Sequence, residues 1–272
     1  MKMRLSNFGF AKDIDAIEKA GFDCIEMHYR EIIPMTDAEF ADLKKKIAAS
    51  PLSVEVVNNP LPLDVQIISP EFKLADYKGH IETGAERAAD LGARFCNFGN
   101  GKTRSLPKEA SAQEVAAARE KICEVIKYVC DVNAKHNISV LVEPLSPVVS
   151  NFILSIPEAI ALGEELGAKN LKTFIDLRWF VDEKRPYDEI IKYADQIQHI
   201  HIDNPVEAFP TRYIPRLSDN FDYEPFINAL KAICYKGIIS CEANTFTDFE
   251  KDLDDVIGFF RHFGIYSYRL GK

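Results

Sequence analysis

Four residues that can bind a metal ion or move a proton lie at the ends of apolar runs in the second half of the chain. They are Glu143 after ISVLV, Asp176 after LKTFI, His201 within IQHIHI and Glu242 after GIISC. Carboxylates gathered without a countercharge repel one another, so a proton or a cation must neutralise them. Three carboxylate oxygens and one imidazole nitrogen suit a divalent ion, and we expect Mn²⁺, with Co²⁺, Mg²⁺, Fe²⁺ and Zn²⁺ as alternatives.

The elements that position these residues alternate between strands and helices along the whole chain. Strand-like runs are predicted at 3–8, 24–29, 53–58, 94–99, 138–144, 171–177, 197–203 and 237–243. Helical patterns are predicted at 12–20, 37–49, 75–91, 111–136, 155–167, 187–195, 223–235 and 249–263. Such alternation predicts a parallel sheet. The turn after the first strand, SNFGFAKD, has one glycine and no phosphate-binding loop, which disfavours an open nucleotide-binding sheet.

The sequence therefore predicts an α/β fold, a (β/α)8 TIM barrel, as a single domain over residues 1–272. In such a barrel the side chains at the carboxyl ends of the strands meet on one face, where active sites are built. The four candidate ligands follow the fifth to eighth strands, 33, 25 and 41 residues apart. Each interval is close to one strand–helix unit, so we expect all four side chains to share one pocket.

Composition argues against some kinds of binding partner and indicates the cellular compartment. The formal net charge is -9, which disfavours nucleic acid and anionic membrane surfaces. No uncharged apolar stretch reaches the length of a membrane span, and the N-terminus lacks the pattern of a signal peptide. The six cysteines form no C-x-x-C pair, which is typical of buried reduced thiols. We expect a cytoplasmic protein without nucleic-acid or membrane partners.

On these residues the chain resembles the xylose-isomerase-like barrels of the sugar isomerase and epimerase superfamily. The resemblance extends from AIEKAGFDCIEMHY through VLVEPL, FIDLRW and HIHIDN to YKGIISCEAN, and E-P-L after the fifth strand is most similar to ketose 3-epimerases. It implies that Glu143, Asp176, His201 and Glu242 hold one essential divalent metal ion. It also implies that the two glutamates exchange a carbon-bound proton from opposite sides of the substrate, and that the chain forms a homodimer or homotetramer.

The predicted function is a sugar isomerase or epimerase acting on a small keto sugar or polyol ketone. A divalent ion polarises the carbonyl and stabilises the enediolate that follows proton removal. Glu143 and Glu242 are the expected catalytic residues, one removing the proton beside the carbonyl and the other returning it.

Substrate contacts are predicted less directly. Trp179 occupies the position where the family typically has a substrate-binding histidine, and it serves either as a platform for a sugar ring or in plain packing. Arg178 and Arg212 either bind the substrate or are solvated surface arginines. His28, at the end of the second strand, is the fourth candidate substrate contact. We expect His199 to be a hydrogen-bonded histidine of the barrel core, and Glu26 to support the pocket.

Other functions use the same ligands. A lyase that dehydrates a keto sugar or cyclic polyol, or eliminates from a 3-keto glycoside, begins with the same proton removal. Dehydroshikimate-type dehydratases tend to have a histidine at the position of Leu145, so this residue argues against that type of lyase. An apurinic-site endonuclease needs more histidines, including one at the position of Trp179, and a basic face, so the net charge of -9 argues against it. A non-catalytic barrel would not require all four ligands, so their presence argues against that hypothesis as well.

Overall fold

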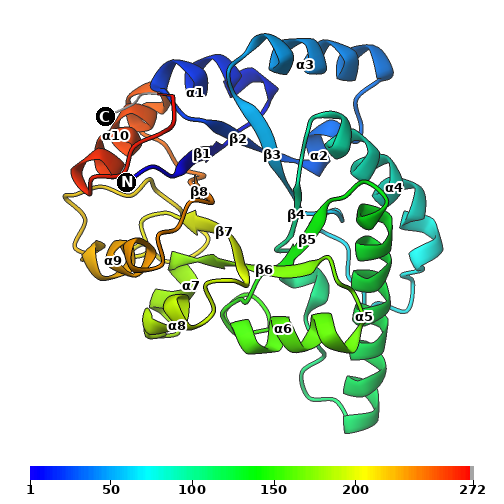
Figure 1. Ribbon diagram of the computed structural model, residues 1–272. Helices are drawn as coiled ribbons and strands as arrows, with labels where there is room; N and C mark the ends of the chain where they lie inside the picture. Colours follow the sequence, from blue (N-terminus) through cyan, green and yellow to red (C-terminus); the bar gives the residue numbers. More distant parts are fainter. Residues whose placement is uncertain (270–272) are drawn as a thin grey trace. The chain divides into compact units, whose positions relative to one another are not determined.

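Eight parallel strands close into a barrel in which they follow one another in sequence order (Figure 1). The structure is a computed structural model and describes residues 1–269. The strands are β1 Arg4–Phe8, β2 Cys24–His28, β3 Ser53–Asn58, β4 Phe95–Phe98, β5 Ser139–Val142, β6 Leu171–Asp176, β7 Ile197–Ile202 and β8 Ile238–Cys241. The predicted (β/α)8 TIM barrel is confirmed, and every strand lies within its predicted range.

Helical segments connect the strands. They are η1 Ala11–Asp13, α1 Ile14–Ala20, α2 Tyr29–Ile32, α3 Asp37–Ala49, α4 Leu74–Asp90, η2 Lys102–Arg104, α5 Ala112–Ala134, α6 Ile156–Glu165, α7 Leu177–Asp182, α8 Asp188–Lys192, α9 Glu224–Ala232 and α10 Phe249–His262. The short α2, η2 and α7 were not predicted. In α7 the side chain of Asp176 accepts a hydrogen bond from the backbone N–H of Arg178, so the carboxylate that ends β6 also begins a helix.

Side chains cap several of the helix starts. Thr36 and Ser111 each form a reciprocal capping box with the glutamate three residues later. Ser155 caps α6, but its partner glutamate bonds the neighbouring Leu154 N–H instead. Asp248 caps α10, where its side chain accepts from the backbone N–H of Lys251.

The core is formed by strands that are buried on both faces. All four residues of β8 are buried, as are the last four of β7 and β6, which is the pattern of a sheet covered by helices. All six cysteines are free thiols. Five are buried as predicted, and Cys234 is exposed.

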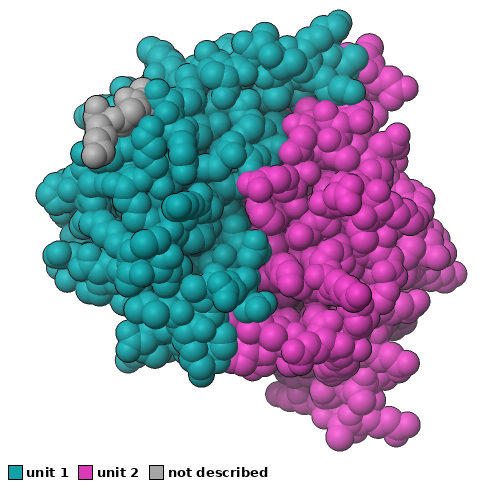
Figure 2. Space-filling model, viewed as in Figure 1, with its two compact units in different colours: residues 1–27, 41–55, 174–272 teal, residues 28–40, 56–173 magenta. Residues whose placement is uncertain are grey.

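The chain divides into two compact units, coloured separately in Figure 2. Unit 1 comprises residues 1–27, 41–55 and 174–272, and unit 2 comprises residues 28–40 and 56–173. Within unit 1, β1 pairs with β2 and β8, and β8 pairs with β7. Within unit 2, β3, β4, β5 and the start of β6 pair in order. A single domain over 1–272 stays a prediction, and its residues 270–272 lie outside the described part.

Among the described helices, none has the length and apolar character needed to span a membrane.

Candidate metal centre

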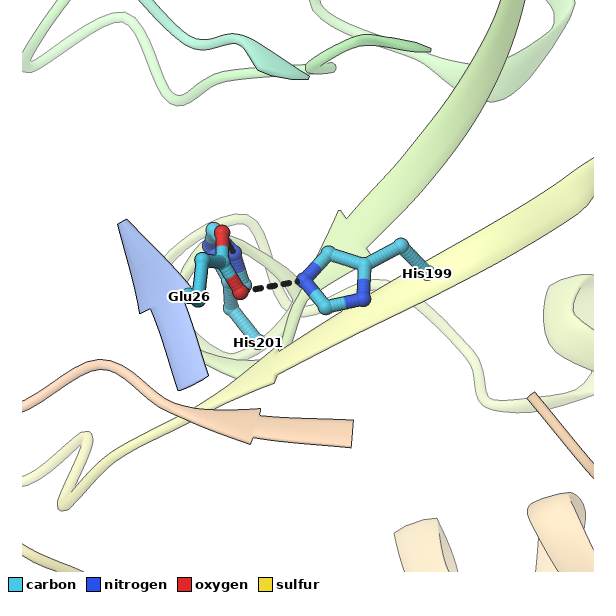
Figure 3. A group of neighbouring side chains, drawn as sticks. All are labelled: Glu26, His199 and His201. Atoms are coloured by element: carbon cyan, nitrogen blue, oxygen red, sulfur yellow. Dashed lines mark hydrogen bonds and ion pairs between the residues drawn. The ribbon is translucent and has the colours of Figure 1, made fainter. Parts of the chain in front are cut away.

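A buried carboxylate fixes the orientation of two histidines in unit 1 (Figure 3). Glu26, on β2, lies 2.8 Å from Nε2 of His199 and 3.0 Å from Nε2 of His201, both on β7. An ionised carboxylate only accepts hydrogen bonds, so each ring donates from Nε2 and, when neutral, presents a lone pair at Nδ1. The predicted core role of His199 and the supporting role of Glu26 are confirmed.

His201 directs its other nitrogen at Glu242. Oε2 of Glu242 lies 3.1 Å from Nδ1 of His201, and Nη1 of Arg212 lies 3.1 Å from the same oxygen. The two side chains form an ion pair when His201 is protonated. The same carboxylate oxygen and imidazole nitrogen are also ligand types that a divalent cation accepts.

Asp176 completes the part of the predicted ligand set that belongs to unit 1. It lies at the end of β6, is buried, and has a carboxylate oxygen within 4.8 Å of a ring nitrogen of His201. Its Oδ1 accepts from the backbone N–H of Arg178 (2.9 Å) and its Oδ2 from Nη2 of Arg212 (2.7 Å). Asp176 and Glu242 thus each approach His201, and both pair with Arg212. Two carboxylates and an imidazole are suitable ligands for a divalent cation.

Neighbouring charges set the protonation of this cluster. Burial acts to raise the pKa of Glu242, but the charges of Arg212 and His201 outweigh it and lower that pKa to about 2. Burial acts to lower the pKa of His201, but Glu26 and Glu242 raise it well above its ordinary value. Without a cation, therefore, a protonated His201 and Arg212 offset part of the negative charge of the carboxylates.

The two arginines predicted as substrate contacts or solvated residues are both buried. Arg178 is 1% exposed, and its guanidinium bonds Asp203 and the carbonyls of the β7–α9 loop. The solvated alternative is therefore wrong for Arg178. It is also wrong for Arg212, which is 5% exposed and reaches Asp176, Asp203 and Glu242.

Trp179 lies on α7 and is 2% exposed. The guanidinium of Arg212 stacks over its ring at 5.1 Å, and the ring of Phe209 lies 5.5 Å away. This contact supports the packing alternative for Trp179. A contact between Trp179 and substrate stays a prediction.

Glu143 and His28 belong to unit 2. Glu143 is buried directly after β5, and Arg104 donates to its backbone carbonyl. A Cβ at Gly99 would lie 2.8 Å from Oε2 of Glu143, so a glycine at 99 leaves space for the carboxylate. His28 is half-buried at the end of β2. Metal ligation by Glu143 and substrate contact by His28 stay predictions.

One residue of this cluster was missed. Asp203 follows β7 in HIHIDN, is fully buried, and pairs with both Arg178 and Arg212. The signal was present, because an acid directly after an apolar strand is the same pattern that identified Glu143. Burial raises the pKa of Asp203 to about 7, against the opposing effect of the arginines.

Solved structures with a similar fold include several sugar epimerases. A 3-keto-D-glucoside 4-epimerase from E. coli has a TM-score of 0.79 and 18% identity, covering 96% of this chain and 99% of that chain. A D-psicose 3-epimerase, solved in the presence of D-fructose, has a TM-score of 0.78 and 17% identity, covering 96% and 99%. An L-ribulose 3-epimerase has a TM-score of 0.76 and 20% identity, covering 96% and 94%.

At these identities the likeness shows the fold alone. A search of curated proteins gave no significant match. The family model described as "Xylose isomerase-like TIM barrel" matches residues 14–263, which is most of the chain and includes every candidate ligand. The chain therefore belongs to the xylose isomerase-like TIM barrel family.

Proposed function

We propose that this chain is a divalent-metal-dependent sugar epimerase or isomerase that moves a proton on the carbon beside a carbonyl. The observation that carries the proposal is that two carboxylates approach His201: Oε2 of Glu242 lies 3.1 Å from its Nδ1, and an oxygen of Asp176 lies within 4.8 Å of a ring nitrogen. Glu26 holds the other nitrogen of His201, and a carboxylate in this position is the usual partner of a metal-binding histidine.

Asp176, His201 and Glu242 are three of the proposed ligands, and Glu143 is the fourth. The support for Glu143 is strand register. It directly follows Val142, which pairs with Thr173 on β6, and Asp176 ends that same strand. Neighbouring parallel strands run in the same direction, so residues after their carboxyl ends belong to the same face of a barrel.

The proposed chemistry is proton exchange between two glutamates. When bound, a divalent cation polarises a carbonyl oxygen and stabilises the enediolate. One of Glu143 and Glu242 removes the proton beside the carbonyl, and the other returns a proton to the opposite face, which inverts the stereocentre. Return to the adjacent carbon would interconvert ketose and aldose. The low pKa of Glu242 keeps its carboxylate ionised, as ligation requires, although it also makes that carboxylate a weak base in the metal-free protein.

Keto sugars are the proposed substrate class. The structurally similar proteins named above are epimerases of a 3-keto-glucoside, of psicose and of ribulose. A suitable screen therefore includes free ketoses, 3-keto glycosides and inososes.

The test is metal analysis followed by turnover in deuterated water. We expect one divalent ion per chain, and deuterium at one carbon of an otherwise unchanged skeleton. Glu242→Gln should keep the fold and lose exchange, whereas Glu250→Gln, which alters an exposed pair with Lys19, should retain it. Wild-type exchange by Glu242→Gln, or by protein freed of metal, would contradict the proposal. Loss of water or of an aglycone would instead identify a lyase.

A further inference from the structure

Arg212 is placed as a resident countercharge among the proposed metal ligands. Its Nη2 lies 2.7 Å from Oδ2 of Asp176, and its Nη1 lies 3.1 Å from Oε2 of Glu242. Both partners are proposed ligands, and they come from two different strands, β6 and β8. One guanidinium therefore spans two of the carboxylates that a cation would join.

The backbone of Arg212 is anchored by the segment that follows β8. Its N–H donates to Oδ1 of Asn244 at 3.0 Å, and its carbonyl accepts from the N–H groups of Asn244 and Thr245. Asn244 also donates to the carbonyl of Pro210. These contacts bring residue 212 next to β8 but do not orient its side chain.

Two contacts orient the side chain. Trp179 lies under the guanidinium at 5.1 Å, which favours a flat cation. Asp203 lies beside it, with Oδ2 at 3.1 Å from Nη1. The same oxygen accepts from Nε and Nη2 of Arg178 at 2.8 and 2.5 Å. Asp203 is thus the buried anion shared by both arginines.

We propose that Asp203 is a positioning residue that holds Arg212 against Asp176 and Glu242, so that a divalent cation must compete with Arg212 for these carboxylates. This inference rests on the proposed metal site. It adds that Arg212 weakens cation affinity, because the guanidinium already satisfies part of the charge that a cation would neutralise. Arg212 also offsets part of the negative charge of the cluster when no cation is present.

Cation affinity separates this role from a merely structural one. We expect Arg212→Met, which keeps an unbranched side chain against Trp179 and removes the charge, to bind Mn²⁺ at least tenfold more tightly than wild type in calorimetry. Asp203→Asn removes the anion that holds the guanidinium against the ligands, so Arg212 should compete less well and Mn²⁺ binding should tighten at least threefold. Arg216→Met is the matched control, because Arg216 pairs with Asp252 away from the ligands, and its affinity should stay within twofold.

The dependence of Asp203 on Arg212 is tested in the double variant. Once Arg212 is methionine, Asp203→Asn should change Mn²⁺ affinity by less than twofold. Equal or weaker Mn²⁺ binding by Arg212→Met, or an undiminished effect of Asp203→Asn in the double variant, overturns the inference while the metal site stands.

A double-mutant cycle on protein stability tests the same contact without any metal. In EDTA, the effects of Asp203→Asn and Arg212→Met on the unfolding equilibrium constant should deviate from additivity at least tenfold, which is about 1.4 kcal/mol. Additivity within twofold overturns the positioning role. If no variant binds a divalent ion but this cycle is coupled, the proposed function fails and the placement of Arg212 by Asp203 is upheld.

Discussion

Replacing Glu26 with glutamine tests the orientation of His201 most directly. The carboxylate accepts one hydrogen bond from His199 and one from His201, whereas an amide of the same shape has one accepting and one donating end. One ring must therefore accept at Nε2 and carry its proton at Nδ1. If that ring is His201, its proton faces Glu242 and the nitrogen cannot bind a cation.

The magnitude follows from the burial and from the number of bonds changed. Glu26 is fully buried, so solvent does not replace its interactions. A hydrogen bond to a charged group contributes about 1.5–3 kcal/mol; both bonds lose the charge of their acceptor, and one of them must reverse its direction. Loss of the carboxylate behind a metal-binding histidine typically lowers metal affinity about 10–100-fold. We expect the same range for Mn²⁺, with the smaller change if the amide oxygen faces His201.

Mn²⁺ calorimetry measures the affinity, and imidazole ¹⁵N shifts of the Zn²⁺-loaded protein report which nitrogen carries the proton. Glu55→Gln is the matched control. Glu55 is also a buried strand glutamate, but it bonds Ser53 and pairs with Arg4, so its replacement should lower stability without changing Mn²⁺ affinity. The reasoning is refuted if Glu26→Gln binds Mn²⁺ within twofold of wild type while His201 keeps its Nε2 proton.

Three further predictions concern protonation, turnover and a helix cap. The pKa of His201 is raised in the folded, metal-free protein, so its stabilisation is complete below the unfolded pKa of about 6.5 and is lost as pH rises through the folded pKa. Urea unfolding in EDTA should show this fall, and saturating Mn²⁺ should abolish it. Glu143→Gln should lower deuterium exchange about 10²–10⁴-fold while circular dichroism stays unchanged. Ser111→Ala should cost about 1 kcal/mol in urea unfolding without affecting exchange, and an unchanged midpoint would contradict the observed cap.

The barrel could be predicted because its signals are local. Strand composition, capping residues and helix-ending glycines are all read within a few neighbouring positions. The helix α7 was missed because its cap, Asp176, was interpreted only as a metal ligand. In the structure one oxygen of Asp176 accepts from the Arg178 N–H and caps the helix, and the other accepts from Arg212.

The ligands of unit 1 could be predicted from strand ends, but their surroundings could not. Arg178 and Arg212 lie in a short helix and a long loop, where a charged residue is ordinarily exposed. Their burial depends on Asp203, Trp179 and the segment after β8. These contacts join residues far apart in the chain, and no periodicity in the sequence specifies them.

The charges of the cluster explain why a divalent ion suits it. Glu26, Asp176, Asp203 and Glu242 are four carboxylates, and Arg178 and Arg212 are the two guanidinium groups that contact three of them. With neutral histidines, two negative charges remain in this part of the cluster, and Glu143, the fourth proposed ligand, would add a third. A proton on His201 offsets only one of them, and burial raises the pKa of Asp203 towards neutrality. The metal-free cluster therefore takes up protons where the metal-bound cluster would take up a cation, because both reduce the repulsion among buried carboxylates.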